Sequence, residues 1–121
     1  MRNILIAVFA VLALCSGVVS AQDNSEKKKI EFIISSVENT KGIEFIRNGS
    51  EYTEKEAAEH LRMKLNNTGK RVQTAEDFIR LCASKSYISG KAYMIRTSDG
   101  KTLKSEEYFR EKLKEYNSSR K

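Results

Sequence analysis

The chain has 121 residues, a net charge of +6, six glycines and no proline. The low glycine content and the lack of proline argue against a many-stranded β-barrel. The basic residues are spread evenly rather than gathered in one stripe, which disfavours nucleic-acid binding and leaves other anionic partners open.

The first 21 residues have the pattern of a cleaved signal peptide. Arg2 supplies a short positive region, an apolar run covers residues 4–14, and Val19-Ser20-Ala21 offers small residues for cleavage after Ala21. The run is too short to span a bilayer. Bulky Leu14 before Cys15 disfavours lipoprotein processing. We therefore expect an exported protein with no transmembrane segment after cleavage.

Residues 22–121 are then expected to form a single domain, since about 100 residues is the commonest domain size. This part carries 21 basic and 16 acidic residues, a net charge of +5 with His60 neutral. Cys82 is its only cysteine, so no intramolecular disulfide can form and an apolar core must supply the stability. Burial is the default expectation for this thiol.

The first half of the domain predicts a helix, a hairpin and a second helix. Residues 25–38 show apolar residues at helical spacing: Ile30, Ile33, Ile34 and Val37. Asn48-Gly49 predicts a turn between strands at 42–47 and 50–52, because both residues tolerate positive φ. Thr53 and Glu56 form a capping box for a helix that ends near Thr68-Gly69, with Gly69 as a left-handed cap. Its apolar stripe comprises Ala57, Ala58, Leu61 and Leu65.

The second half repeats this order after one short helix. Thr74 is predicted to cap that helix, whose inner face carries Ala75, Phe78, Ile79 and Cys82. Strands are expected at 92–96 and 101–103, around a turn at 98–100. Ser105 is expected to cap a last helix that frays beyond Tyr116, with Phe109, Leu113 and Tyr116 on its inner face.

The strings FIRNGSEYTEKEAAEHLRMKL and MIRTSDGKTLKSEEYFREKL share the order strand, glycine turn, strand, hydroxyl cap and helix. A hairpin-helix unit is thus used twice, either through duplication or through shared local physics. The predicted fold class is α+β, with two β-hairpins forming a small antiparallel sheet packed against about four helices.

These strings, and above all FIRNGSEY and SKSYISGKAYMIR, resemble a domain-of-unknown-function family of short exported bacterial proteins typified by the enterobacterial protein YfeK. The resemblance extends from about Ile43 to Tyr116. It implies a periplasmic or secreted bacterial protein. The family has no established activity, so it supplies no catalytic residues.

The segment RLCASKSYISGK, residues 80–91, is the leading candidate for a binding site. Its hydroxyls, backbone amides and lysines could hold a carboxylate or phosphate. The candidate binding residues are Arg47, His60, Arg80, Ser84, Lys85, Ser86, Ser89, Lys91 and Arg96. In the alternative interpretation, the serines only terminate a helix, the lysines are solvated, and the two strand-ending arginines, Arg47 and Arg96, bridge glutamates across the sheet.

Catalytic chemistry is weakly supported. His60 could act as a base or pair with Glu56, and Glu76 stands in the favourable order for a surface ion pair with Arg80. We predict no catalytic residue, metal site or cofactor. The preferred function is a non-enzymatic binding module of the cell envelope that engages an anionic polymer or a protein. The alternative is a small envelope hydrolase or transferase that uses His60 with a nearby serine or carboxylate.

Overall fold

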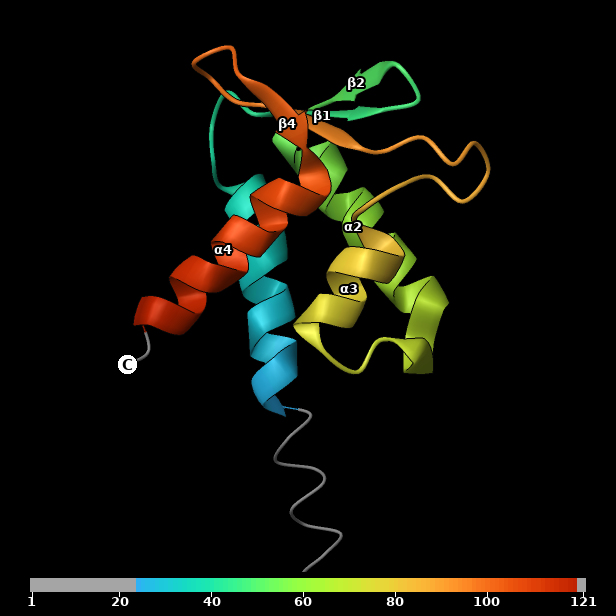
Figure 1. Cartoon of the computed structure of the whole chain (residues 1–121), viewed down its shortest axis with the longest axis vertical. Helices are drawn as coiled ribbons and strands as arrows, with labels where there is room; N and C mark the ends of the chain where they lie inside the picture. Colours follow the sequence, from blue (N-terminus) through green and yellow to red (C-terminus); the bar gives the residue numbers. More distant parts are fainter. Residues whose placement is uncertain (1–23, 120–121) are drawn as a thin grey trace, which may run out of the picture.

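The computed structural model describes residues 24–119, and the predicted signal peptide lies outside the described residues (Figure 1). The first element is a helix over residues 24–38. It is followed by β1 (Glu44–Arg47), β2 (Ser50–Tyr52), α2 (Glu54–Thr68), the 3-10 turn η1 (Gly69–Arg71), α3 (Ala75–Cys82), β3 (Met94–Arg96), β4 (Thr102–Lys104) and α4 (Ser105–Ser119).

The two hairpins form one antiparallel sheet, and the helices cover one of its faces (Figure 1). The strand order is β2-β1-β3-β4, so the first strand of each hairpin is central. Phe45 pairs with Ile95 across the centre of the sheet, and both side chains are buried on the helix side. The predicted α+β class and the use of two hairpin-helix units are confirmed.

The core lies between the sheet and the helices. The helix over residues 24–38 runs between α3 and α4 (Figure 1), and its Ile33, Ile34 and Val37 are fully buried. Cys82 is also fully buried, and burial raises the pKa of its thiol, which identifies it as a core residue. Each helix within residues 24–119 falls short of the length and apolar character needed to cross a bilayer.

Most element boundaries agree with the sequence patterns, and three details differ. Ser105 is the first residue of α4, and its buried hydroxyl donates to the Ala83 carbonyl, so its main role is to tie α4 to the end of α3. Gly69 has a φ of 59° and a ψ of −126°, which lies outside the left-handed helical region expected for this cap. The last helix continues past Tyr116 to Ser119, and Tyr116 packs against Phe32 with a ring separation of 5.0 Å.

The capping box at the start of α2 is complete. The Glu56 amide donates to the Thr53 hydroxyl at 3.2 Å, and the Thr53 amide donates to the Glu56 carboxylate at 2.9 Å. We expect Thr53→Ala to lower the free energy of unfolding by about 1 kcal/mol, because one amide of the first turn loses its partner. Thr53→Ser keeps the hydroxyl and serves as the control. Urea unfolding that gave equal values for both variants would refute this role.

Candidate functional site

His60 lies on the flank of α2, beside the sheet. It is one residue away from the buried stripe of Ala57 and Leu61, which places its ring at the edge of the core. Its Nε2 is 3.4 Å from the Tyr93 hydroxyl, and its ring centroid is 6.3 Å from that of Phe45. The expected alternative, a pair with Glu56, does not form, because the Glu56 carboxylate bonds Thr53 in the capping box.

The pKa of His60 falls from 6.5 to about 4. Burial is the main cause, and the positive charges of Arg47 and Lys64 add to it. His60 is therefore neutral at neutral pH and is a weak base there. Arg47 and Lys64 are the two cations that act on this ring.

Lys64 stands one helical turn after His60 and joins α2 to the segment before β3. Its Nζ donates to the Tyr93 hydroxyl at 2.9 Å and to the Lys85 carbonyl at 3.4 Å. The same ammonium lies 4.5 Å from the centre of the Tyr87 ring and 5.0 Å from that of Tyr93. Its partners are thus aromatic rings and neutral oxygens, which leave its charge uncompensated.

Arg47 carries the second uncompensated charge. It ends β1, and its guanidinium donates to the Tyr52 hydroxyl at 3.2 Å and lies 5.3 Å from the centre of that ring. Among the ion pairs between residues 24 and 119, none includes Arg47 or Lys64. We call Arg47, His60, Lys64 and Tyr93 the basic cluster.

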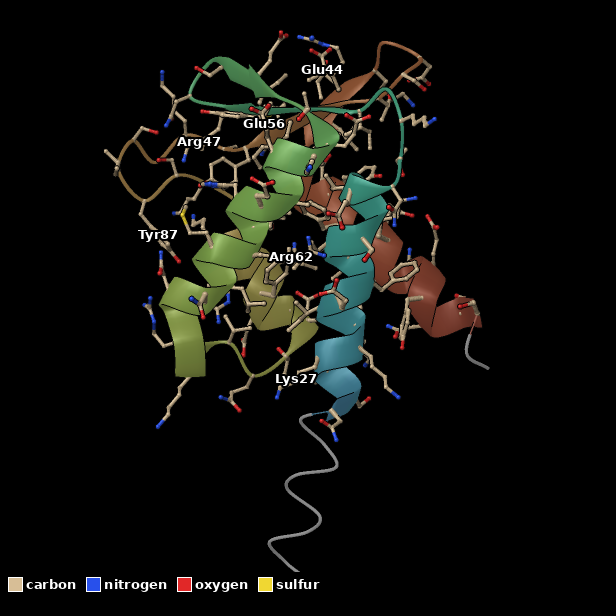
Figure 2. All side chains as sticks on the ribbon, turned by 180° about the vertical axis from the view of Figure 1, so that it is seen from behind. Lys27, Glu44, Arg47, Glu56, Arg62 and Tyr87 are labelled. Atoms are coloured by element: carbon tan, nitrogen blue, oxygen red, sulfur yellow. The ribbon has the colours of Figure 1, made fainter. Side chains whose placement is uncertain are left out.

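The segment from 84 to 92, which we call the serine loop, projects beside this cluster. The loop is drawn in orange in Figure 1, and Figure 2 shows Arg47 and Tyr87 on the same side of the molecule. The Ser89 hydroxyl donates to the Asn48 side chain, which joins the loop to the turn of the first hairpin. Segments that are far apart in the sequence therefore meet here.

Hydrogen bonds fix the backbone of the serine loop. The Ser86 amide donates to the Lys91 carbonyl at 3.0 Å, and the Gly90 amide donates to the Ser86 carbonyl at 2.9 Å. Gly90 has a φ of 75°, which suits a residue without a Cβ atom. The Ser84 hydroxyl donates to the Ile79 carbonyl at 2.6 Å, and Ser86 is buried. The Ser84 hydroxyl bonds the last turn of α3, as the simpler interpretation expected, whereas Ser86 bonds residues of the loop itself and does not terminate the helix.

The tip of the serine loop is apolar. Ile88 is 99% exposed and Tyr87 is 56% exposed. The Tyr87 hydroxyl donates to the Leu81 carbonyl, so its ring is held against the body of the protein. Sequence reasoning counted the serines and lysines of this segment and overlooked its two large apolar side chains.

The structure brings some of the predicted site residues together and separates others. Arg47, His60, Lys85 and Ser89 lie in the basic cluster or contact it through a neighbour, and Lys91 lies on the same loop. Lys64 and Tyr93 were missed. The available signals were the four-residue spacing from His60 to Lys64 and the position of Tyr93 two residues before the inward Ile95.

Arg96 and Arg80 lie away from the cluster. Arg96 binds Glu44 at 3.0 Å and Glu51 at 2.7 Å, which matches the predicted bridging of glutamates across the sheet. Because Ile95 points inward, its neighbour Arg96 is on the outer face, opposite to Arg47.

The predicted pair between Glu76 and Arg80 is wrong. Arg80 binds Asp77 at 3.1 Å, and Glu76 instead binds Arg110 of α4 at 3.3 Å. Asp77 completes the capping box of Thr74, which places its carboxylate one turn before Arg80. Glu76 is thereby free to turn toward α4.

A separate open groove lies between the helix over residues 24–38 and the end of α2. It has a volume of about 530 Å³, and Ile30, Leu65 and Val72 contribute apolar side chains to it. None of the predicted binding residues lines this groove. The nearby Arg62 binds Glu31 at 2.7 Å and Glu38 at 3.2 Å, so it holds the two helices together (Figure 2).

Residues 24–117 match the family model described as a family of unknown function, DUF5329. The chain is also 38% identical over 93 residues to the uncharacterized protein YfeK of Salmonella typhimurium, an alignment that covers 77% of each chain. No solved structure matches the chain. This protein therefore belongs to the DUF5329 family, whose function is unknown.

Proposed function

We propose that this protein is a non-enzymatic binding module of the bacterial cell envelope, periplasmic or secreted, which engages an anionic or protein partner through the serine loop. The observation that carries this proposal is Ile88, which is 99% exposed on a loop whose backbone is fixed by hydrogen bonds. A fixed loop loses little conformational entropy when it binds. Isolated apolar residues are common on surfaces, but here Ile88 projects next to the half-exposed ring of Tyr87, which adds apolar surface beside it.

The charges around the loop support an anionic partner. Lys85 and Lys91 flank the tip, and Lys64 and Arg47 stand behind it without carboxylate partners among the described ion pairs.

The enzymatic alternative is less well supported. Among the described residues, the hydrogen-bond partner of His60 is Tyr93 rather than a serine or a carboxylate. A pKa of about 4 also makes His60 a poor general base at neutral pH.

Photo-crosslinking from the tip tests the proposal. A photoreactive phenylalanine derivative replaces Ile88 in the full chain, and the same derivative at exposed Lys114 of α4 serves as the control. After illumination of intact cells, we expect protein or lipid adducts from position 88 in the envelope fraction and at least fivefold fewer from position 114. Because Lys85→Gln and Lys91→Gln remove flanking charge, together they should lower the yield at position 88. Equal yields from both positions, or recovery in the cytoplasm alone, would refute the proposal.

A further inference from the structure

We infer that the partner of the serine loop is an anionic phospholipid surface, into which Ile88 inserts while the flanking lysines contact lipid phosphates. This inference rests on the proposed binding function and names its partner. It follows from three features of the loop: a projecting apolar tip, a fixed backbone and a surrounding set of cations.

The tip has the side chains that suit a membrane interface. Ile88 is aliphatic and 99% exposed, so insertion would remove nearly all of its side chain from water. Tyr87 lies beside it at 56% exposure, and although its hydroxyl is bonded to the Leu81 carbonyl, the exposed part of its ring adds apolar surface of the kind enriched at the level of lipid headgroups. Lys85 and Lys91, one on each side of this pair, have long side chains that can reach headgroup phosphates.

The fixed backbone keeps the tip exposed. The loop closes on itself through the Ser86 and Gly90 amides, and Lys85 pairs with Ala92 in an isolated β-bridge. The cation of Lys64 lies over the Tyr87 ring, whose hydroxyl is bonded to the Leu81 carbonyl. Ile88 therefore cannot fold back into the core without breaking these contacts, and the tip is ready for insertion.

The charges favour an anionic surface over a neutral one. Each lysine or arginine close to an anionic membrane raises affinity by roughly fivefold. Lys85 and Lys91 flank the tip, and the Lys64 ammonium contacts the Lys85 carbonyl and the Tyr87 ring. Arg47 lies on the same side of the molecule as Tyr87 (Figure 2). The aromatic and carbonyl partners of Lys64 leave its positive charge uncompensated.

A lipid surface fits this shape better than a protein partner does. A stable protein interface buries about 800 Å² on each side and is usually anchored by several aromatic or arginine side chains. The serine loop offers one aliphatic side chain and one tyrosine that is already bonded to the protein, both between lysines. Shallow insertion needs only such a tip together with electrostatic attraction.

Vesicle sedimentation tests this inference. The full chain is expressed, and the protein is purified from the envelope as the cell processes it. It is then mixed with phosphatidylcholine vesicles, with and without phosphatidylglycerol. We expect binding only with phosphatidylglycerol, about tenfold weaker binding for Ile88→Ser, and near wild-type binding for Ile88→Leu. Lys85→Gln with Lys91→Gln should weaken binding by roughly twentyfold, whereas the distant Lys114→Gln should have little effect.

The outcomes separate this inference from the proposed function. Protein adducts from position 88, with no vesicle binding, would overturn the lipid partner and leave the binding function intact. Vesicle binding that is unchanged by Ile88→Ser would show that another surface meets the membrane, and it would also overturn the inference. Because Ile88 is fully exposed, the variants should fold like the wild type, which circular dichroism can verify.

Discussion

Phe45→Ala should lower the free energy of unfolding by about 3 to 5 kcal/mol. Phe45 is 1% exposed on a central strand, and its ring centroid lies 5.2 Å from that of Tyr93. The alanine would leave a cavity between the sheet and α2, where the ring of His60 also packs. Since a domain of this size has a total stability of about 5 to 15 kcal/mol, the loss should be large in a urea titration.

Ile46→Ala is the matched control, because it changes the next residue of the same strand. Ile46 points to the opposite face of the sheet and is only half-buried, so we expect a loss of about 1 kcal/mol. Equal losses for the two variants would mean that the helices do not pack on the face of the sheet that carries Phe45.

Stability should also fall as the pH is lowered from about 6.5 to about 4. His60 has a pKa of about 4 in the folded chain, against 6.5 for an ordinary histidine. Between these values the unfolded chain binds more protons, so acid favours unfolding. The stabilisation is fully present above pH 6.5 and is lost as the pH approaches 4. For a half-buried ring, we expect a loss of about 2 kcal/mol across this window.

The chain has a single histidine, which makes this prediction simple to check. Proton NMR should show one imidazole titration with a midpoint near 4. A midpoint near 6.5 would contradict the buried, positively charged setting. Lys64→Gln should raise the midpoint, because it removes one of the charges that disfavour the protonated ring.

His60→Gln is the control for the stability measurement. The variant should lose most of the pH dependence between 6.5 and 4.5. Hydrogen bonds lower the pKa values of Glu56, Asp77 and Asp99. The fold therefore loses stability through protonation of these carboxylates only at lower pH. A pH dependence that persisted unchanged in the variant would assign the effect to other groups.

The fold could be predicted because its signals are local. Asn48-Gly49 sets the first hairpin, Thr53 and Glu56 start α2, and the spacing of Ile33, Ile34 and Val37 marks the buried side of a helix. Ser105 shows where local signals fail. It has the sequence of a helix cap, but its hydroxyl finds a partner at Ala83, 22 residues away.

The candidate site could be predicted only in part, because its contacts are not local. Lys64 and Tyr93 are 29 residues apart, and only the packing of α2 against the segment before β3 brings them together. The register of β1 against β3 decides that Arg47 and Arg96 face opposite sides of the sheet. Sequence spacing cannot reveal that register or show which loop residue will be left in water.

The short outer strands have a consequence for self-association. Both β2 and β4 have three residues, and α2 and α4 begin almost immediately after them. An unpaired strand edge normally invites a second chain to add a strand, which is the first step toward aggregation. Here each edge ends after three residues and carries a charge, Glu51 on β2 and Lys104 on β4. The two edges of the sheet therefore offer a further strand little backbone to pair with, although the chain has no proline to guard them.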